Sequence, residues 1–329
     1  MMCPTAPKRR QPHRSSFAAC LLALSLAVSA RAQNAIDVVS PAGPYERVVT
    51  MGASLTDGFA NGMPIATMLD KSIGVDHRPV ERVSSNAFFT MPLKIGDQQL
   101  RRALHLEPTC VIAVDFLFWY VYGPTGRHID DLQANPLEDE EARKREVRAL
   151  SDATPEDLPR VVRLLTLERG LRELDKLRVP MVIGDIPDMT GALPIMLPKR
   201  AIPSIDIQKA ANERIRAWAI ERKDHVLLFP LASRVLAMKQ GKMEIPATKS
   251  EPAVPLAMEV ALGRDRLHPS KIGALVFMSE LVDALRKFLP GHANALDFDL
   301  RERIAARGLD DVWKSKADSG AGGDRAIGK

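Results

Sequence analysis

The stretch "VVTMGASLTDGFAN", Val48 to Asn61, joins an apolar run to a glycine, a serine and a second glycine-containing turn. The apolar residues are typical of a buried strand, and Gly52 permits a sharp change of direction directly after it. We expect a helix to begin next, which places Ser54 where a strand gives way to a helix. Ligands of α/β proteins bind at the edge of the sheet that is formed by the carboxyl ends of the strands. The alternative is that Ser54 and Thr56 only cap the helix.

Four further β-rich runs alternate with longer helical patterns along the chain. Several of these runs are almost continuously apolar, as in parallel strands that are covered on both faces. The order predicts a three-layer α/β/α sandwich with a five-stranded, mostly parallel, doubly wound sheet. Strands are expected at 46–52, 79–85, 108–116, 179–187 and 224–230, and helices at about 62–73, 92–105, 158–177, 207–222 and 270–288.

The amino terminus has the pattern of a secretory signal peptide. Basic residues precede a short apolar run from Phe17 to Val28, and Ala30-Arg31-Ala32 follows it. The run is too short to span a bilayer. We therefore expect residues 1–32 to be removed, residues 33–45 to form a linker, and the mature protein to be periplasmic or secreted. The alternative is an ordinary N-terminal helix.

The net charge of +5 belongs to this N-terminal segment. Residues 1–32 hold five of the 46 Lys and Arg and none of the 41 Asp and Glu, which leaves 41 of each. A balanced chain gives no support to a nucleic-acid partner. Only Cys110 lies beyond residue 32, so the mature chain cannot form an internal disulfide. No later segment is apolar enough to cross a membrane, and no motif for a metal or nucleotide is present, so no cofactor is expected.

A second group of chemically active residues lies in "GRDRLHPSKIGA", Gly263 to Ala274, where Asp265 and His268 stand three apart. A serine hydroxyl is a poor nucleophile until a base accepts its proton, and a histidine base works best when a carboxylate fixes its tautomer. An apolar helix follows at once, which marks a loop-to-helix junction at the same sheet edge. A purely structural histidine is the alternative.

Taken together, "GASLTDG", "DRLHPS" and the α/β units between them resemble the SGNH/GDSL hydrolase superfamily of esterases and lipases, a flavodoxin-like fold. The resemblance covers roughly 47–289, within a domain expected at 46–290. It implies that Ser54 is the nucleophile and that Asp265 and His268 complete a catalytic triad. We expect cleavage of a carboxylic ester of a small molecule, lipid or sugar through an acyl-Ser54 intermediate. Acyl transfer by the same triad, or a non-catalytic ligand-binding protein on this fold, remain alternatives, and the oligomeric state stays open.

The chain departs from the family where the oxyanion hole should be. The family uses the N–H of the nucleophile, a glycine N–H from a second block and an asparagine side chain from a third. Here the second block reads Asn86-Ala87-Phe88-Phe89 without a glycine, and Asp115 follows the third strand with no asparagine. Ala53 also replaces the usual aspartate. We predict that the Asn86 amide donates to the oxyanion; the alternative is a turn residue.

Other residues near the expected site have more open roles. Asp115 is predicted as a pocket residue whose role is open. A carboxylate near the oxyanion would oppose the chemistry unless it is protonated or turned to hold a neighbouring loop. Phe116, Phe118 and Trp119 fit either the core or an apolar acyl pocket. The charge-rich insertion at about 122–157 is read as a lid or as surface decoration. Residues 291–329 form a C-terminal extension, expected to be disordered from about 314.

Overall fold

The computed structural model describes residues 43–249 and 251–311. The expected signal peptide, most of the expected linker and the tail from 314 lie outside the described residues. Within the described ranges, no helix has the length and apolar character needed to cross a membrane.

The centre of the fold is a parallel sheet of five strands in the order β2-β1-β3-β4-β5, and every neighbouring pair runs parallel. This confirms the predicted fold class. The chain moves outward in opposite directions from β1 and β3, so the topological switch point lies between these two strands. The strands are β1 (Val48–Thr50), β2 (Glu81–Arg82), β3 (Cys110–Ala113), β4 (Met181–Gly184) and β5 (Val226–Phe229).

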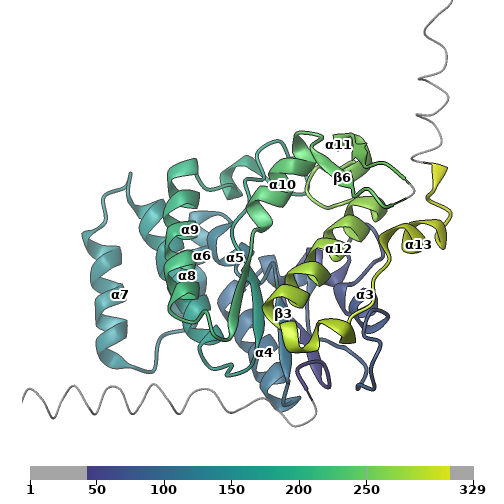
Figure 1. The fold of residues 1–329 in the computed structure, drawn as a ribbon. Coiled ribbons are helices and arrows are strands. Elements are labelled where there is room, and N and C mark those ends of the chain that lie inside the picture. The colour runs from purple at the N-terminus through teal and green to yellow at the C-terminus, as the bar shows by residue number, and fades with distance from the viewer. Residues whose placement is uncertain (1–42, 250, 312–329) are drawn as a thin grey trace, which may run out of the picture. The chain divides into compact units, whose positions relative to one another are not determined.

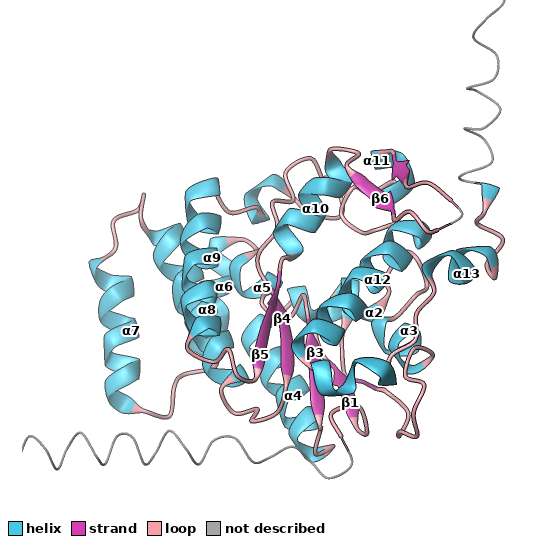
Figure 2. Ribbon diagram, viewed as in Figure 1, coloured by secondary structure: helices cyan, strands magenta, loops and turns pink. Residues whose placement is uncertain are grey.

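Helices cover both faces of the sheet (Figures 1 and 2). Alternation along β3 shows the two layers, because Val111 and Ala113 pack into one apolar cluster while Cys110 and Ile112 pack into the other. Successive side chains of a strand point to opposite faces, so each strand supplies both cores. The first layer contains α4 (Pro92–His105), α8 (Leu158–Leu174) and α9 (Ile205–Ile220); the second contains α3 (Ile65–Asp70) and α12 (Lys271–Phe288).

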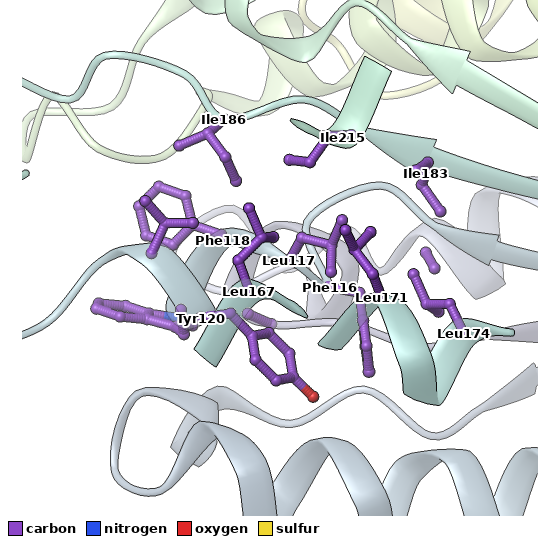
Figure 3. Close-up of a cluster of buried hydrophobic side chains, with 14 of the residues drawn as sticks. Phe116, Leu117, Phe118, Tyr120, Leu167, Leu171, Leu174, Ile183, Ile186 and Ile215 are labelled. Atoms are coloured by element: carbon purple, nitrogen blue, oxygen red, sulfur yellow. The ribbon is translucent and has the colours of Figure 1, made fainter. Parts of the chain in front are cut away.

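The aromatic run after β3 begins in the first of these cores. Phe116 and Tyr120 are fully buried, and their rings lie 5.5 Å apart. Figure 3 shows them beside Leu167 and Leu171 of α8. The short helix α5 (Phe118–Val121) follows, and it also carries Phe118 and Trp119. Phe116 is therefore a core residue.

Several short elements were not expected from the sequence. The hairpin of β6 (Met243–Ile245) and β7 (Val254–Leu256) and the helix α10 (Leu231–Lys239) lie in segments for which no strand or helix was predicted. Three-residue strands, one containing a proline, carry too little alternation to be recognised. The other unexpected short elements are η2 (Asn86–Phe89), η3 (Lys199–Ala201) and α11 (Met258–Ala261), whereas α2 (Ser54–Asp57) begins where the sequence predicted a helix after Gly52.

The insertion forms two helices, α6 (Thr125–Ala134) and α7 (Glu140–Asp152). Figure 1 shows α7 on the outer side of α8, away from α10 and α11. The carboxylate of Glu146 accepts a hydrogen bond of 2.8 Å from Nε of Arg169 on α8, and both side chains are nearly buried. This ion pair fixes α7 against the helical layer, so α7 decorates α8 instead of covering the site.

The first part of the C-terminal extension packs on the domain. It contains η4 (Pro290–Ala295) and α13 (Leu300–Ala305). Leu296 forms a bridge with Ile73, and Ile304 is fully buried in the second core. The first part of the expected C-terminal extension is therefore folded onto the domain.

Candidate active site

The turn after β1 has room only for a glycine at position 52. Gly52 has φ +148°, and a Cβ atom there would lie 2.2 Å from Oδ1 of Asp115. The buried side chain of Gln99 on α4 holds the same residue, because it accepts the Gly52 N–H at 2.7 Å and donates to the Gly52 carbonyl at 2.9 Å. The strand therefore ends in a fixed orientation, and α2 begins directly afterwards at Ser54.

Asp115, which follows β3, organises the start of α2. Its carboxylate accepts hydrogen bonds of 2.9 Å from the N–H groups of Ala53 and Leu55, and further bonds from the N–H and hydroxyl of Thr56. Among the hydrogen bonds of the described residues, none uses the N–H of Ser54. One donor is thus left free beside the serine hydroxyl, while its neighbours are occupied.

Burial and hydrogen bonding act in opposite directions on Asp115. Complete burial raises the pKa of its carboxyl group, and the bonds from Thr56, Ala53 and Leu55 lower it by less, so the pKa lies above its ordinary value. Desolvation disfavours a charge that is removed from water. The carboxylate accepts hydrogen bonds from the backbone of the turn. Asp115 is therefore turned to hold a neighbouring loop, which is one of the two alternatives that the sequence left open.

The loop before α12 places a histidine beside the serine. Nε2 of His268 lies 2.9 Å from Oγ of Ser54, and Nδ1 of His268 lies 2.7 Å from Oδ2 of Asp265. The structure thus brings together three side chains from opposite ends of the domain. His268 is only 3% exposed, so the imidazole is shielded from water except toward the cavities described below.

Asp265 also fixes the shape of its own loop. Its Oδ1 accepts the N–H groups of Leu267 and His268, both at 3.0 Å. Burial raises the pKa of Asp265, but these hydrogen bonds and the imidazole together outweigh it, so the pKa lies below its ordinary value. Asp265 is therefore ionised at neutral pH, as needed to orient the ring and to stabilise an imidazolium.

Contacts from the segment after α2 hold the histidine loop. The amide of Asn61 donates to the carbonyl of Pro269 at 3.2 Å, and its oxygen accepts the N–H of Met63 at 2.8 Å. The ring of Phe59 lies 5.1 Å from that of His268. The turn that carries the nucleophile and the loop that carries the base are therefore joined directly, apart from the sheet.

Two cavities meet at Ser54 and His268. The inner cavity has a volume of about 50 Å³ and a largely apolar lining that includes Leu55, Phe118, Trp119, Met189, Leu231 and Met238. The outer cavity has a volume of about 410 Å³ and contains Asn86, Phe59, Phe89, Arg127, Arg200 and Met196. A substrate bond beside Ser54 would therefore have a narrow apolar space on one side and a wide, partly cationic space on the other.

Most of the expected site residues line one or both of these two cavities. Ser54, His268 and Trp119 line both cavities, Phe118 and Asp115 line the inner one, and Asn86 lines the outer one. Asn86 is exposed at the start of η2. Phe116 lines neither cavity, because the turn after β3 directs its side chain between the sheet and α4. In the described part of the chain, no three His, Cys, Asp or Glu side chains are grouped as a metal site requires.

The sequence interpretation missed two residues that shape the site, Gln99 and Asn61. Gln99 occupies the apolar side of α4 together with Leu93, Leu100 and Ala103, and it is 4% exposed. A polar residue on the apolar side of a predicted helix is visible in the sequence, so Gln99 could have been recognised from this pattern. Asn61 offers no such signal, because an asparagine next to glycine also fits an ordinary turn.

The fold and these contacts define an α/β/α protein with a serine, histidine and aspartate hydrogen-bonded in series at the sheet switch point. No family model matches the chain, and no curated protein matches it. It is similar to a solved GDSL-like lipase from Bacteroides thetaiotaomicron, with 14% identity and a TM-score of 0.39 over 79% of this chain and 97% of the lipase.

Two further solved structures are similar to this chain. The psychrotrophic esterase EstA from Pseudoalteromonas has 13% identity and a TM-score of 0.37, over 74% of this chain and 99% of the esterase. A gut microbial diltiazem-metabolizing enzyme has 12% identity and a TM-score of 0.41, over 73% of this chain. The chain spans about half of that enzyme, because the match covers 46% of its length. GDSL-type lipases and esterases are thus among its structural neighbours, at low sequence identity.

Proposed function

We propose that this chain is a divergent serine hydrolase of the SGNH type that cleaves a carboxylic ester. The observation that carries the proposal is the series of hydrogen bonds from Ser54 through His268 to Asp265, with 2.9 Å and 2.7 Å between the paired atoms. A serine, a base and an orienting carboxylate at these distances match the requirements of nucleophilic catalysis. The substrate is a small-molecule, lipid or sugar ester.

In the first half of the reaction, Oγ of Ser54 attacks the ester carbonyl carbon while Nε2 of His268 takes the hydroxyl proton. The carbonyl oxygen becomes an oxyanion, which accepts a hydrogen bond from the free N–H of Ser54 and one from the Asn86 amide. The C–O bond to the alcohol then breaks, and His268 returns the proton to the departing oxygen. The alcohol leaves, and an acyl group remains on Ser54.

In the second half, a water molecule replaces the alcohol. His268 takes a proton from the water as its oxygen attacks the acyl carbon, and the same donors stabilise the second oxyanion. The bond to Ser54 breaks, Oγ regains the proton from His268, and the carboxylic acid leaves. Throughout, Asp265 holds the Nδ1–H of His268 and stabilises the imidazolium, while Asp115 keeps the turn of Ser54 in place.

The decisive experiment is labelling of the purified protein with a fluorophosphonate probe, followed by peptide mapping. We expect one labelled peptide containing Ser54, and hydrolysis of p-nitrophenyl acetate by the unlabelled protein. The matched control is Ser151→Ala, which removes a serine hydroxyl from exposed α7 and should change neither result. Absence of labelling, or equal labelling of Ser54→Ala, would contradict the proposal.

We also propose that the protein is exported with residues 1–32 removed. The support is the basic, apolar and Ala-x-Ala pattern of the N-terminal sequence. Expression of the full chain in a bacterial host with N-terminal sequencing of the periplasmic and secreted fractions tests this. Gln33 is expected as the first residue, and an uncleaved chain retained in the cytoplasm would contradict export without affecting the proposed chemistry.

A further inference from the structure

The outer cavity carries a pronounced charge asymmetry. Arg127 and Arg200 contribute to its lining, whereas no aspartate or glutamate does. In the described ranges, neither guanidinium forms an ion pair, although many of the other arginines do. Two arginines without carboxylate partners in a cavity that also contains Ser54 and His268 indicate a place for an anionic group.

The first arginine is held in position by its surroundings. Nη1 of Arg127 donates to the carbonyl of Phe89 at 2.7 Å, and its guanidinium lies 5.8 Å from the centre of the Phe89 ring. That ring in turn lies 5.7 Å from Trp119, which lines both cavities. One guanidinium nitrogen is thus used for anchoring, while the others are left to bind a ligand. An anchored side chain loses less rotamer freedom when the ligand binds.

The second arginine comes from a different segment that is tied to the first. Arg200 lies on η3, and the carbonyl of Ala201 at the end of η3 accepts the N–H of Gly123 at 2.8 Å. Gly123 and Pro124 lead directly into α6, which carries Arg127. The start of the insertion and the loop after β4 therefore form one wall of the outer cavity, and this wall carries both cations.

The inner cavity has the opposite character. Its lining is mostly apolar, and its one acidic side chain is the buried Asp115. An anionic part of a substrate would lose water there without gaining a cation, which is unfavourable. The volume of about 50 Å³ also limits this side to a small group. The two cavities therefore sort the two parts of an ester by size and charge.

We propose that the substrate is an ester with a carboxylate or phosphate on its larger part, which lies in the outer cavity against Arg127 and Arg200, and with a small neutral part in the inner cavity. This inference rests on the proposed esterase function and adds the substrate class. A guanidinium group can bind a carboxylate or a phosphate through two parallel hydrogen bonds, in a bidentate geometry. The anionic group can lie on the alcohol part or on the acyl part of the ester, and the experiment distinguishes these two cases.

The test compares esters that differ only in charge. 4-Acetoxybenzoate and 4-acetoxybenzamide carry the charge difference on the alcohol side, whereas monomethyl terephthalate and methyl 4-carbamoylbenzoate carry it on the acyl side. Each kcat/KM is divided by the rate of alkaline hydrolysis of the same ester, which removes differences in intrinsic reactivity. We expect the anionic ester to be preferred by about five- to tenfold in at least one pair, as for partly exposed charge pairs.

Variants assign the preference to the two arginines. Arg127→Gln and Arg200→Gln should each reduce the ratio of kcat/KM for the anionic ester to kcat/KM for its neutral partner by about two- to threefold, and the double variant should abolish this preference. Lys199→Gln is the matched control, because it removes a charge from η3 next to Arg200 but outside the cavity lining. The preference should survive in this control and decrease in wild type as ionic strength rises.

The outcomes separate this inference from the function on which it rests. Hydrolysis of the neutral esters without a preference for the anionic ones, or a preference that survives in the double variant, overturns the inference and leaves the esterase function standing. Failure of the wild-type protein to hydrolyse any of the four esters or p-nitrophenyl acetate overturns the proposed function, and the inference with it.

Discussion

Two carboxylates lie at the candidate site, and they differ in burial, in the groups that they contact and in the direction of their pKa shifts. Asp115 is buried just beyond the end of β3, and all of its side-chain hydrogen bonds come from the turn that carries Ser54. Asp265 lies in a partly exposed loop and contacts the ring of His268. Burial dominates at Asp115 and raises its pKa, whereas hydrogen bonds dominate at Asp265 and lower its pKa.

The comparison teaches how position decides the role of the same chemical group. Both carboxylates accept backbone N–H groups and so fix a turn. In the proposed mechanism, only Asp265 also contacts a group that gains charge, so its ionised form is part of the proposed chemistry. Asp115 acts through geometry alone, because it takes the donors around Ser54 and leaves one donor free. Variants of the two residues should therefore fail in different ways.

The largest effect is expected for Asp265→Asn. The amide would favour the wrong tautomer of His268 and could not stabilise an imidazolium, so kcat for p-nitrophenyl acetate should fall by about 10⁴-fold. Circular dichroism should show a retained fold. Asp283→Asn, an exposed aspartate on α12, is the control and should keep full activity. A fully active Asp265→Asn would mean that the orienting carboxylate lies elsewhere.

A smaller effect is expected for Asn86→Ala, which tests the donors that accompany the free N–H of Ser54. Loss of a donor that acts mainly on the oxyanion should lower kcat by about two orders of magnitude, with KM and melting temperature almost unchanged. Steady-state kinetics and thermal unfolding measure both. A lower melting temperature with activity within a few-fold of wild type would make Asn86 a turn residue instead.

Asp115→Asn should damage folding more than chemistry. The amide replaces one acceptor by an NH₂ group that faces the N–H groups of the turn, and unpaired buried donors cost about 2 to 3 kcal/mol in unfolding free energy. Denaturant unfolding checks this value, and kcat should fall by about tenfold as Ser54 loses its orientation.

Thr56→Val is the matched control for this variant, since it removes only the hydroxyl contact with Asp115 and keeps the backbone donors paired. It should cost about 1 kcal/mol, the value of one hydrogen bond. If Asp115→Asn were as stable as wild type while kcat fell by 10⁴-fold, Asp115 would belong to the chemistry and the contrast with Asp265 would disappear.

The smallest effect is a pH dependence of stability with opposite signs at the two residues. Asp265 has a lowered pKa, so its stabilising contribution is present above the ordinary value of 3.8 and is lost as pH falls through the folded pKa. Asp115 has a raised pKa, so its contribution is present below 3.8 and is lost as pH rises through the folded value.

Difference curves of unfolding free energy against pH, wild type minus each asparagine variant, measure these contributions. The Asp265 curve should decline toward low pH, and the Asp115 curve should decline toward neutral pH. Two curves that decline in the same direction would show that burial and hydrogen bonding do not separate the residues as the structure indicates.

Much of the fold could be predicted because its signals are local. Apolar runs such as "CVIAV" are typical of buried parallel strands, and the five observed strands lie inside the five expected ones. The helices α4 and α12 begin within one residue of their expected starts, where Pro92 occupies the first turn and Ser270 caps the helix. The hairpin of β6 and β7 was missed because its strands are too short for a period to emerge.

The sequence by itself predicted the order of the five sheet strands and the main helices along the chain, and it contains a single cysteine after residue 32. These points follow from periodicity and composition, which are properties of the sequence alone. The candidate residues Ser54, Asp265 and His268 were found at two loop-to-helix junctions, and their roles as a triad were implied by the resemblance to the SGNH/GDSL superfamily. The role of Asp115 was left open, because a carboxylate after a strand can face either a substrate or a backbone turn.

Only the tertiary structure decided how distant segments meet. It placed His268 against Ser54 across 214 positions of the chain, turned Asp115 onto the N–H groups of α2, and buried Phe116 in the core. It also brought Arg127 and Arg200 to one wall of the outer cavity. Such contacts depend on strand order and helix packing, which local patterns do not encode, so the electrostatic character of the site emerges only when the layers are assembled.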